Sequence, residues 1–184
     1  MNPHELLKTF GPDNETGLDL LIVHSEVVAK YSLEVARWVP ELSPDLIFIE
    51  EAALLHDIGV AKTHAPAIGC HGQEPYMKHG LLGATLLREL GYPRHARVCE
   101  NHIGVGLTRE DILTQKLPLP PTDIVPESVE EQIIAYVDNF FSKGAAPHVP
   151  RKFDSVRKKM ASFGARCLFT FDMWAEKFGR VGDH

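Results

Sequence analysis

The sequence contains little that would cross-link the chain or anchor it in a membrane. Its three cysteines, Cys70, Cys99 and Cys167, are widely spaced and include no Cys-x-x-Cys pair. This usage predicts reduced thiols rather than a disulfide framework or a structural zinc site. No run approaches the ~20 apolar residues that span a bilayer, and the N-terminal MNPHELLKTF lacks the basic and apolar regions of a signal peptide. We therefore expect a cytoplasmic protein without a membrane partner.

Positive charge is also scarce. The chain has 19 lysines and arginines against 25 acidic residues, which gives a formal net charge of −6. Duplex nucleic acids are bound through dense Lys/Arg surfaces, so this balance argues against duplex nucleic acid as the main partner. A small phosphorylated substrate stays compatible with the composition, because bound cations reverse the local field of an acidic protein.

No segment alternates strongly enough to predict a β-strand, and no internal repeat is present. Apolar residues recur at three- and four-residue steps, which is typical of amphipathic helices. A chain of 184 residues can bury a self-sufficient core, so we expect a single all-α domain over 1–184. This helical bundle would have a core at about 17–142, on which C-terminal helices within 151–178 pack. The predicted helices cover 17–39, Ser43-Pro44 to about Gly59, 79–90, 93 to about 104, a short turn after Thr108, 129–142, 151–162 and 165–178.

Capping residues and turn residues set the expected ends of these helices. Thr16 with Asp19, and Ser128 with Glu131, have the spacing of a capping box. The segment 60–78 contains two prolines and two glycines, which predicts a loop of a length that is often functional.

The ten histidines are more than we expect by chance, and their positions are informative. The pair His56-Asp57 comes at the end of an apolar helix, where a charged aspartate is costly unless it is paired or bound to a cation. Together the two side chains offer an imidazole nitrogen and a hard carboxylate oxygen to one divalent ion. Taken alone, the pair is better explained as an ordinary helix-end histidine beside a solvated aspartate.

Four more residues of metal-ligand type lie beside apolar neighbours on separate predicted helices. His24 is on the apolar side of the first helix, His79 begins a helix and His102 ends one. Asp138 lies within an apolar run, where an unpaired carboxylate would be expensive. Each alone has a simpler interpretation, as a core histidine or as an aspartate paired with a lysine. Together they predict a metal site built from inward-facing residues of several helices.

In this order the residues resemble the extended H…HD…H…H…D pattern of the HD superfamily of metal-dependent phosphohydrolases. The string HDIG at 56–59 matches the signature of that superfamily, and the resemblance covers roughly residues 20–142. It implies an HD-type helical bundle that hydrolyses a phosphomonoester, a phosphodiester or a phosphoanhydride. The substrate implied is a small phosphorylated molecule, of the nucleotide type.

The resemblance also implies which residues bind metal. One ion would be held by His24, His56, Asp57 and Asp138, and a second by His79 and His102 with Asp57 as the bridge. Imidazole and carboxylate ligands suit iron, manganese, nickel, cobalt or zinc better than magnesium alone. Two cations roughly 3.5–4 Å apart lower the pKa of a shared water and clamp the entering and leaving oxygens. The mechanistic hypothesis is in-line attack on phosphorus by the bridging hydroxide, with His56 and Asp57 at the catalytic centre.

The sequence departs from two better-known dinuclear families. Cyclic-dinucleotide phosphodiesterases carry a Gly-Tyr-Pro signature, which is absent around His102. Those enzymes and the symmetrical diadenosine-tetraphosphate hydrolases usually have a lysine three residues after the HD aspartate, where this chain has Val60. The nearest lysine, Lys62, is either a third catalytic residue that contacts a substrate phosphate or a solvated loop lysine. Two alternatives stay open, a single-metal nucleotidase and a non-catalytic metal- or nucleotide-binding HD module.

The C-terminal part carries an aromatic cluster and a basic run. The aromatic residues are Phe169, Phe171, Trp174 and Phe178, which we expect to form either core or the face of a homodimer. The basic residues are Arg151, Lys152, Arg157, Lys158 and Lys159, which we expect to form a solvated helix face.

Overall fold

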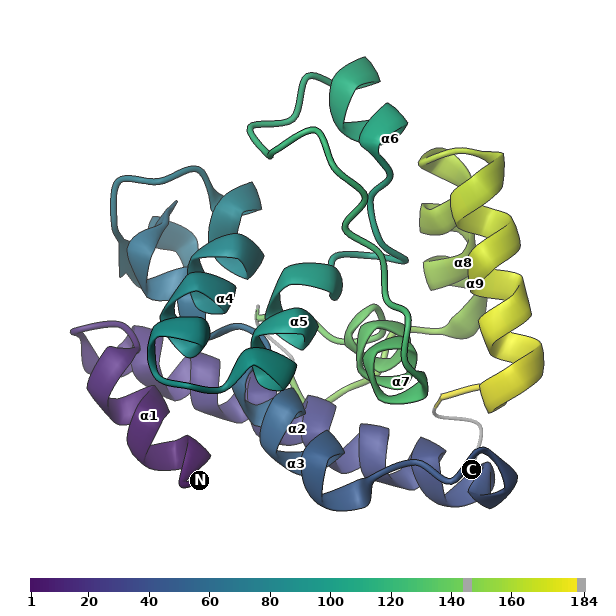
Figure 1. Ribbon diagram of the computed structural model, residues 1–184, viewed down its shortest axis with the longest axis horizontal. Helices are drawn as coiled ribbons and strands as arrows, with labels where there is room; N and C mark the ends of the chain where they lie inside the picture. Colours follow the sequence, from purple (N-terminus) through teal and green to yellow (C-terminus); the bar gives the residue numbers. More distant parts are fainter. Residues whose placement is uncertain (144–146, 182–184) are drawn as a thin grey trace.

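The computed structural model describes residues 1–143 and 147–181 (Figure 1), so 144–146 and 182–184 of the predicted domain lie outside the described residues. The described part is helical, as predicted, and none of its helices is long and apolar enough to cross a bilayer. Its α-helices are α1 (Pro3–Phe10), α2 (Glu15–Trp38), α3 (Leu46–Leu55), α4 (His79–Glu89), α5 (Pro93–Asn101), α6 (Arg109–Thr114), α7 (Val129–Asp138), α8 (Phe153–Ser162) and α9 (Ala165–Phe178).

The segment between α3 and α4 is more regular than the predicted loop. It contains the 3₁₀ helices η2 (Ile58–Lys62), η3 (Pro66–Ile68) and η4 (Tyr76–Lys78), and the strands β1 (His64–Ala65) and β2 (Cys70–His71). The two strands pair antiparallel. The expectation of no strand was wrong here, because two-residue strands are too short to produce an alternating pattern.

Two helix starts differ from the predicted ones. Helix α3 begins after Asp45, whose carboxylate accepts a hydrogen bond from the Phe48 amide at 3.1 Å. Ser43 instead adopts a left-handed conformation (φ 51°) at the end of the 3₁₀ helix η1 (Pro40–Leu42), so it cannot cap α3. Helix α2 begins one residue after Asn14, which is its cap in place of Thr16. Helix α1, capped by Asn2, was not predicted.

The cap of α7 is half of the predicted capping box. Ser128 accepts a hydrogen bond from the Glu131 amide at 3.2 Å. The Glu131 carboxylate does not return to Ser128, because it accepts from the Glu127 amide at 2.9 Å and from Arg97 at 2.8 Å. The short helix α6 has the complete box, formed by Thr108 and Asp111.

Several helices end earlier than predicted, and these ends place the residues of metal-ligand type. Helix α3 stops at Leu55, so His56 and Asp57 lie in the turn between α3 and η2. Helix α5 stops at Asn101, directly before His102. Helix α7 ends at Asp138 rather than at residue 142. Apart from His24, which lies within α2, the ligand-type side chains therefore lie at ends of helices, where the chain can turn toward a shared centre.

The helices share two main hydrophobic clusters. In Figure 1, α2 and α3 run side by side along the lower edge, α4 and α5 lie above them, and α8 and α9 flank α7 on the right. The larger cluster joins α2, α3, α7 and α9, and the smaller one joins α1, η2, α4 and α5. Phe171, Trp174 and Phe178 are buried in the larger cluster, as core, whereas Phe169 is 67% exposed. All three cysteines are buried as free thiols.

A close backbone approach joins the HD turn to the next helix. A Cβ atom on Gly59 would lie 2.1 Å from the carbonyl oxygen of His79 and 2.3 Å from the amide nitrogen of Gly83. Both atoms belong to the α4 backbone and cannot move aside as a side chain would. The glycine of the HDIG string therefore lets η2 pack directly against the start of α4, and this contact sets the separation of Asp57 and His79.

We predict that Gly59→Ala destabilises the fold strongly, by about 3 kcal/mol or more, because the new methyl group overlaps backbone atoms. Gly91→Ala is the matched control: its φ is +84°, but its Cβ would meet no described atom within 4 Å. That change should cost only about 1–2 kcal/mol, through the left-handed backbone alone. Urea unfolding of both variants measures the difference, and equal losses would show that the close approach is not a constraint.

Candidate metal centre

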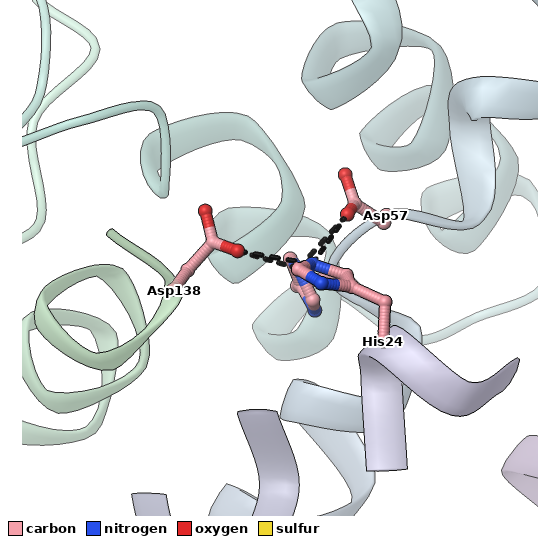
Figure 2. Close-up of side chains that lie close together, drawn as sticks. His24, Asp57 and Asp138 are labelled. Atoms are coloured by element: carbon pink, nitrogen blue, oxygen red, sulfur yellow. Dashed lines mark ion pairs between the residues drawn. The ribbon is translucent and has the colours of Figure 1, made fainter. Parts of the chain in front are cut away.

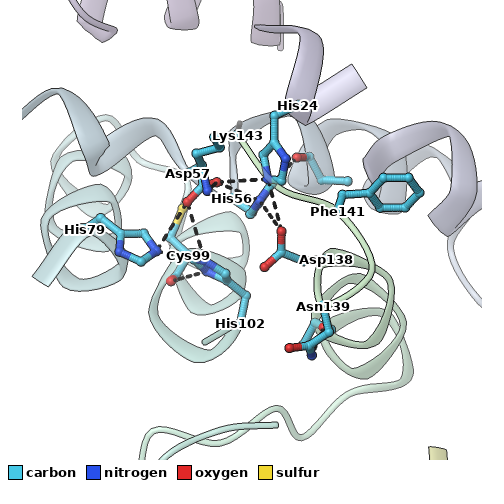
Figure 3. A network of polar contacts seen from close by, with 12 residues as sticks. His24, His56, Asp57, His79, Cys99, His102, Asp138, Asn139, Phe141 and Lys143 are labelled. Atoms are coloured by element: carbon cyan, nitrogen blue, oxygen red, sulfur yellow. Dashed lines mark hydrogen bonds and ion pairs between the residues drawn. The ribbon is translucent and has the colours of Figure 1, made fainter. Parts of the chain in front are cut away.

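Six side chains converge from five parts of the fold (Figure 3). His24 comes from the middle of α2, His56 and Asp57 from the turn after α3, His79 from the first residue of α4, His102 from the residue after α5, and Asp138 from the last residue of α7. All are buried except Asp138, whose side chain is 20% exposed. The structure therefore brings together every residue that the sequence predicted as a metal ligand; that they bind metal stays a prediction.

The two carboxylate oxygens of Asp57 face two different sets of histidines. Oδ2 lies 3.0 Å from Nε2 of His56 and 3.2 Å from Nε2 of His24. Oδ1 lies 3.3 Å from Nε2 of His79 and 3.6 Å from Nε2 of His102. Asp57 is thus the one residue of the centre that faces both sets.

Asp138 completes the first set. Its Oδ1 lies 3.0 Å from Nε2 of His24, the residue that also approaches Asp57 in Figure 2, and 3.5 Å from Nε2 of His56. We call His24, His56, Asp57 and Asp138 the first ligand group, and Asp57, His79 and His102 the second. Within each group the potential ligand atoms lie within 4.8 Å of one another. The two groups share Asp57 alone.

Three of the histidines are oriented by the same local device. Nδ1 of His56, His79 and His102 lies 2.6, 2.8 and 2.8 Å from the backbone carbonyl three residues earlier in the chain. His56 and His102 follow the ends of α3 and α5, where carbonyl groups lack helical partners. His79 follows η4, and its backbone amide donates to the same Tyr76 carbonyl. Donation from Nδ1–H makes Nε2 the nitrogen that faces the centre, as in metal-ligating histidines.

The donor atoms of the first group fit a divalent cation. Nε2 of His24, Nε2 of His56 and both oxygens of Asp57 are buried and form no hydrogen bond of normal geometry with the described residues, although they lie within ion-pair distance of one another and of Lys143. Buried polar atoms are costly when they are unsatisfied. A cation among them would satisfy these atoms at once, and mixed imidazole and carboxylate donors suit transition metals.

The pKa values reflect how strongly the buried charges interact. Burial lowers the pKa of His79 to about 4, so its ring is neutral at physiological pH and can donate a lone pair. Burial also opposes the charged form of His56, but the carboxylates of Asp57 and Asp138 outweigh it and raise its pKa to about 10. Hydrogen bonds and charge interactions with His24 and His56 hold the pKa of Asp138 well below its usual value against the effect of burial. The centre thus favours positive charge next to its two carboxylates.

Lys143 is a residue of the site that the sequence did not reveal. Its ammonium group contacts Oδ2 of Asp57 and lies 3.2 Å from the hydroxyl of Tyr76 (Figure 3). Burial opposes its charge, but Asp57 outweighs this effect and raises the pKa of Lys143 above its usual value. Lys143 lies five residues beyond the end of α7, where no helical pattern indicates its direction.

The structure places the predicted catalytic Lys62 elsewhere. Lys62 is exposed at the end of η2, and it is not among the residues that line the cavity beside the centre. Val60 is buried in the smaller hydrophobic cluster. Lys143 is therefore the lysine at the ligand groups, and the catalytic role of Lys62 stays an untested prediction.

A cavity of about 550 Å³ opens beside the two ligand groups. His24, His79, His102 and Asp138 contribute to its lining, together with three basic residues, Lys143, Arg151 and Lys159. The segment 60–78 supplies part of the apolar wall, including Ile68 and Met77. A volume of this size is typical of small-molecule sites.

Comparisons with known proteins agree with this arrangement. The family model described as HD domain matches residues 21–142. The chain is 35% identical over 122 residues to protein MJ0778 of Methanocaldococcus jannaschii, covering 65% of this chain and 64% of that protein. It is 34% identical over 147 residues to a tRNA (cytidine(56)-2′-O)-methyltransferase of Picrophilus torridus, covering 79% of this chain and 38% of that protein. The chain thus spans less than two thirds of the length of these curated relatives.

One solved structure shares the fold. The crystal structure of the HD domain of the Listeria monocytogenes phosphodiesterase PgpH superposes with a TM-score of 0.54 at 14% identity, covering 96% of this chain and 94% of that one. At this identity the likeness concerns the fold alone.

We predict that Asp57→Ala removes metal from both ligand groups, whereas His79→Ala removes metal from the second group only. The reason is that Asp57 offers one oxygen to each group. His95→Ala is the control, because His95 lies outside both groups and pairs with Glu51 at 3.2 Å. Elemental analysis of anaerobically purified protein measures the metal content. Full metal content in Asp57→Ala would contradict the bridging arrangement.

Proposed function

The chain belongs to the HD domain family, and from this premise and the geometry of its buried centre we propose that it is a metal-dependent phosphohydrolase. The observation that carries the proposal is the placement of Asp57, whose two oxygens face two separate ligand groups. Such an arrangement suits two divalent cations, drawn from iron, manganese, nickel, cobalt or zinc. The substrate we propose is a small phosphorylated molecule of the nucleotide type.

The chain's own residues would hold and orient the reacting groups. Bound divalent cations supply Lewis acidity, which activates water and neutralises phosphoryl oxygens. The two ligand groups fix where those cations lie, and the carbonyl contacts of His56, His79 and His102 keep the rings from turning. In the reaction proposed, water oxygen forms a bond to phosphorus, the bond to the leaving oxygen breaks, and the leaving group takes up a proton.

We assign Lys143 the role of contacting the transferred phosphoryl group. Its ammonium contacts Oδ2 of Asp57 and Lys143 lines the cavity; a cation held at Oδ2 would take over that contact and leave the ammonium for a phosphoryl oxygen. Hydrogen bonds between an ammonium and a phosphate oxygen are charge-assisted and strong. The hydroxyl of Tyr76, 3.2 Å from the ammonium, helps to hold it there.

Two other functions fit the family and are separated by experiment. A single-metal nucleotidase would contain one metal per chain and would tolerate His79→Ala. A non-catalytic metal- or nucleotide-binding module would bind ligands without turnover. The paired ligand groups favour the two-metal hydrolase over both. The methyltransferase activity in the name of one relative belongs to a protein of which this chain matches only 38%.

We predict that the protein loaded with manganese or iron hydrolyses p-nitrophenyl phosphate, bis-p-nitrophenyl phosphate or a nucleotide from a broad panel. Lys143→Ala should lower kcat/KM by about 10- to 100-fold, or about 1.4–2.7 kcal/mol of transition-state stabilisation, without loss of metal. Lys8→Ala, an exposed residue of α1, is the control. Absence of turnover across the panel, with two metals bound, would overturn the hydrolase and favour the binding module.

A further inference from the structure

Two more basic residues line the cavity beyond Lys143. Arg151 lies just before α8, and Lys159 lies on α8 itself. From the sequence, both are expected on a solvated helix face. Like their neighbour Arg157, which pairs with Asp172 at 2.7 Å, both are exposed. Arg151 and Lys159 also line the same cavity as His24 and Asp138, which the sequence did not predict.

Neither Arg151 nor Lys159 is neutralised by the described part of the protein. No carboxylate oxygen of the described residues lies within 4.0 Å of either side chain. Most of the other cavity residues are apolar or belong to the ligand groups. In a chain of net charge −6, two unpaired cations on one cavity wall indicate a site for an anion.

Arg151 is held in place by one edge of its guanidinium group. Its Nη1 donates to the carbonyl oxygens of Phe141 at 3.0 Å and Asn139 at 3.3 Å, just past the end of α7. Its backbone amide donates to the carbonyl of Phe140 at 2.8 Å. All its side-chain hydrogen bonds to described residues use Nη1, so the other nitrogens of the fork remain for a ligand. A guanidinium fixed in this way is suited to a phosphate group.

An exposed aromatic ring lies beside Lys159. Phe163 is 53% exposed and lines the same cavity, and its ring centroid lies 5.8 Å from Nζ of Lys159. Together they offer a flat apolar face next to a cation. This combination fits an organic molecule that carries a phosphate, rather than a free inorganic ion.

The charges of the cavity are therefore separated. On one side it is lined by Asp138 and by histidines of the ligand groups, which suit cations, and elsewhere by Arg151 and Lys159, which suit an anion. Among the described residues, Lys143 contacts Asp57, whereas neither Arg151 nor Lys159 contacts a member of the ligand groups. We propose that the substrate carries a second phosphate, bound by Arg151 and Lys159, so that the cavity takes a doubly phosphorylated small molecule rather than a simple phosphomonoester. The proposal rests on the proposed function for the position of the first phosphoryl group.

The test uses the full chain loaded with manganese and compares ligands with one and two phosphates. Calorimetry measures the affinity of adenosine 5′-monophosphate, adenosine 3′,5′-bisphosphate and the non-hydrolysable α,β-methylene analogue of adenosine 5′-diphosphate. At least one doubly phosphorylated ligand should bind 10-fold or more tightly than the monophosphate. Lys159→Gln should weaken that ligand 5- to 10-fold and leave the monophosphate unchanged. Lys158→Gln, exposed on the same helix and outside the cavity, should change neither.

A second variant and a kinetic measurement keep the outcome clear. Arg151→Gln, like Lys159→Gln, should weaken the doubly phosphorylated ligand and leave the monophosphate unchanged. The thermal unfolding midpoint of Arg151→Gln reports any loosening of the end of α7. For a doubly phosphorylated substrate, Lys159→Gln should raise KM with little change in kcat, as expected for lost binding away from the reacting atoms. Equal binding of singly and doubly phosphorylated ligands, or equal weakening of both by Lys159→Gln, would overturn the inference.

The results also distinguish this inference from the proposed function. If monophosphates are hydrolysed and Lys159→Gln changes no ligand affinity, the second phosphate site is wrong and the hydrolase stands. If binding of the doubly phosphorylated ligand depends on Lys159 but no compound is hydrolysed, the hydrolase is wrong and the anion site stands. Both conclusions follow from the same set of variants.

Discussion

The carboxylate of Asp57 has no exposed surface, and a buried charge of this kind is expensive unless cations or hydrogen bonds compensate it. Histidine nitrogens and one ammonium group surround it, and bound cations would complete the compensation. Histidines arrive from α2, from the turn after α3 and from the ends of α4 and α5, and the ammonium of Lys143 approaches from beyond α7. The ends of these helices are placed so that they meet at one carboxylate. The absence of a side chain on Gly59 lets the turn that carries Asp57 lie against α4.

Much of this centre could be predicted from the sequence, because its ligands are polar residues in apolar surroundings. Asp138 within the apolar run of α7 and His24 on the apolar side of α2 are conspicuous for that reason alone. Periodicity predicted most of the helices, though not α1, and α9 was predicted at its observed bounds. Helix ends were less predictable. The choice between Ser43 and Asp45 as the cap of α3 depends on a backbone conformation that residue types alone do not determine.

The basic residues of the cavity were beyond the reach of sequence reasoning. Lys143 and Arg151 follow α7 in a segment without periodicity, so only the folded chain shows which way they point. Lys159 belongs to a run of similar residues, and only its position on α8 distinguishes it from Lys158. These three residues also lie beyond the matched range 21–142. In the function we propose, the family segment provides the chemistry, and the part of the chain that follows it selects the molecule.

The histidines that follow helix ends link the metal affinity of the centre to substitutions in those helices. The rings of His56 and His102 each contact a carbonyl that the last helical turn would otherwise leave without a partner. The orientation of a ligand is thereby coupled to the local fraying of its helix. A substitution several residues earlier in α3 or α5 that loosens the last turn would free a ring to rotate. Metal affinity would then depend on the helical propensity of residues that do not contact the ion. Slow amide exchange at these turns would accompany tight metal binding.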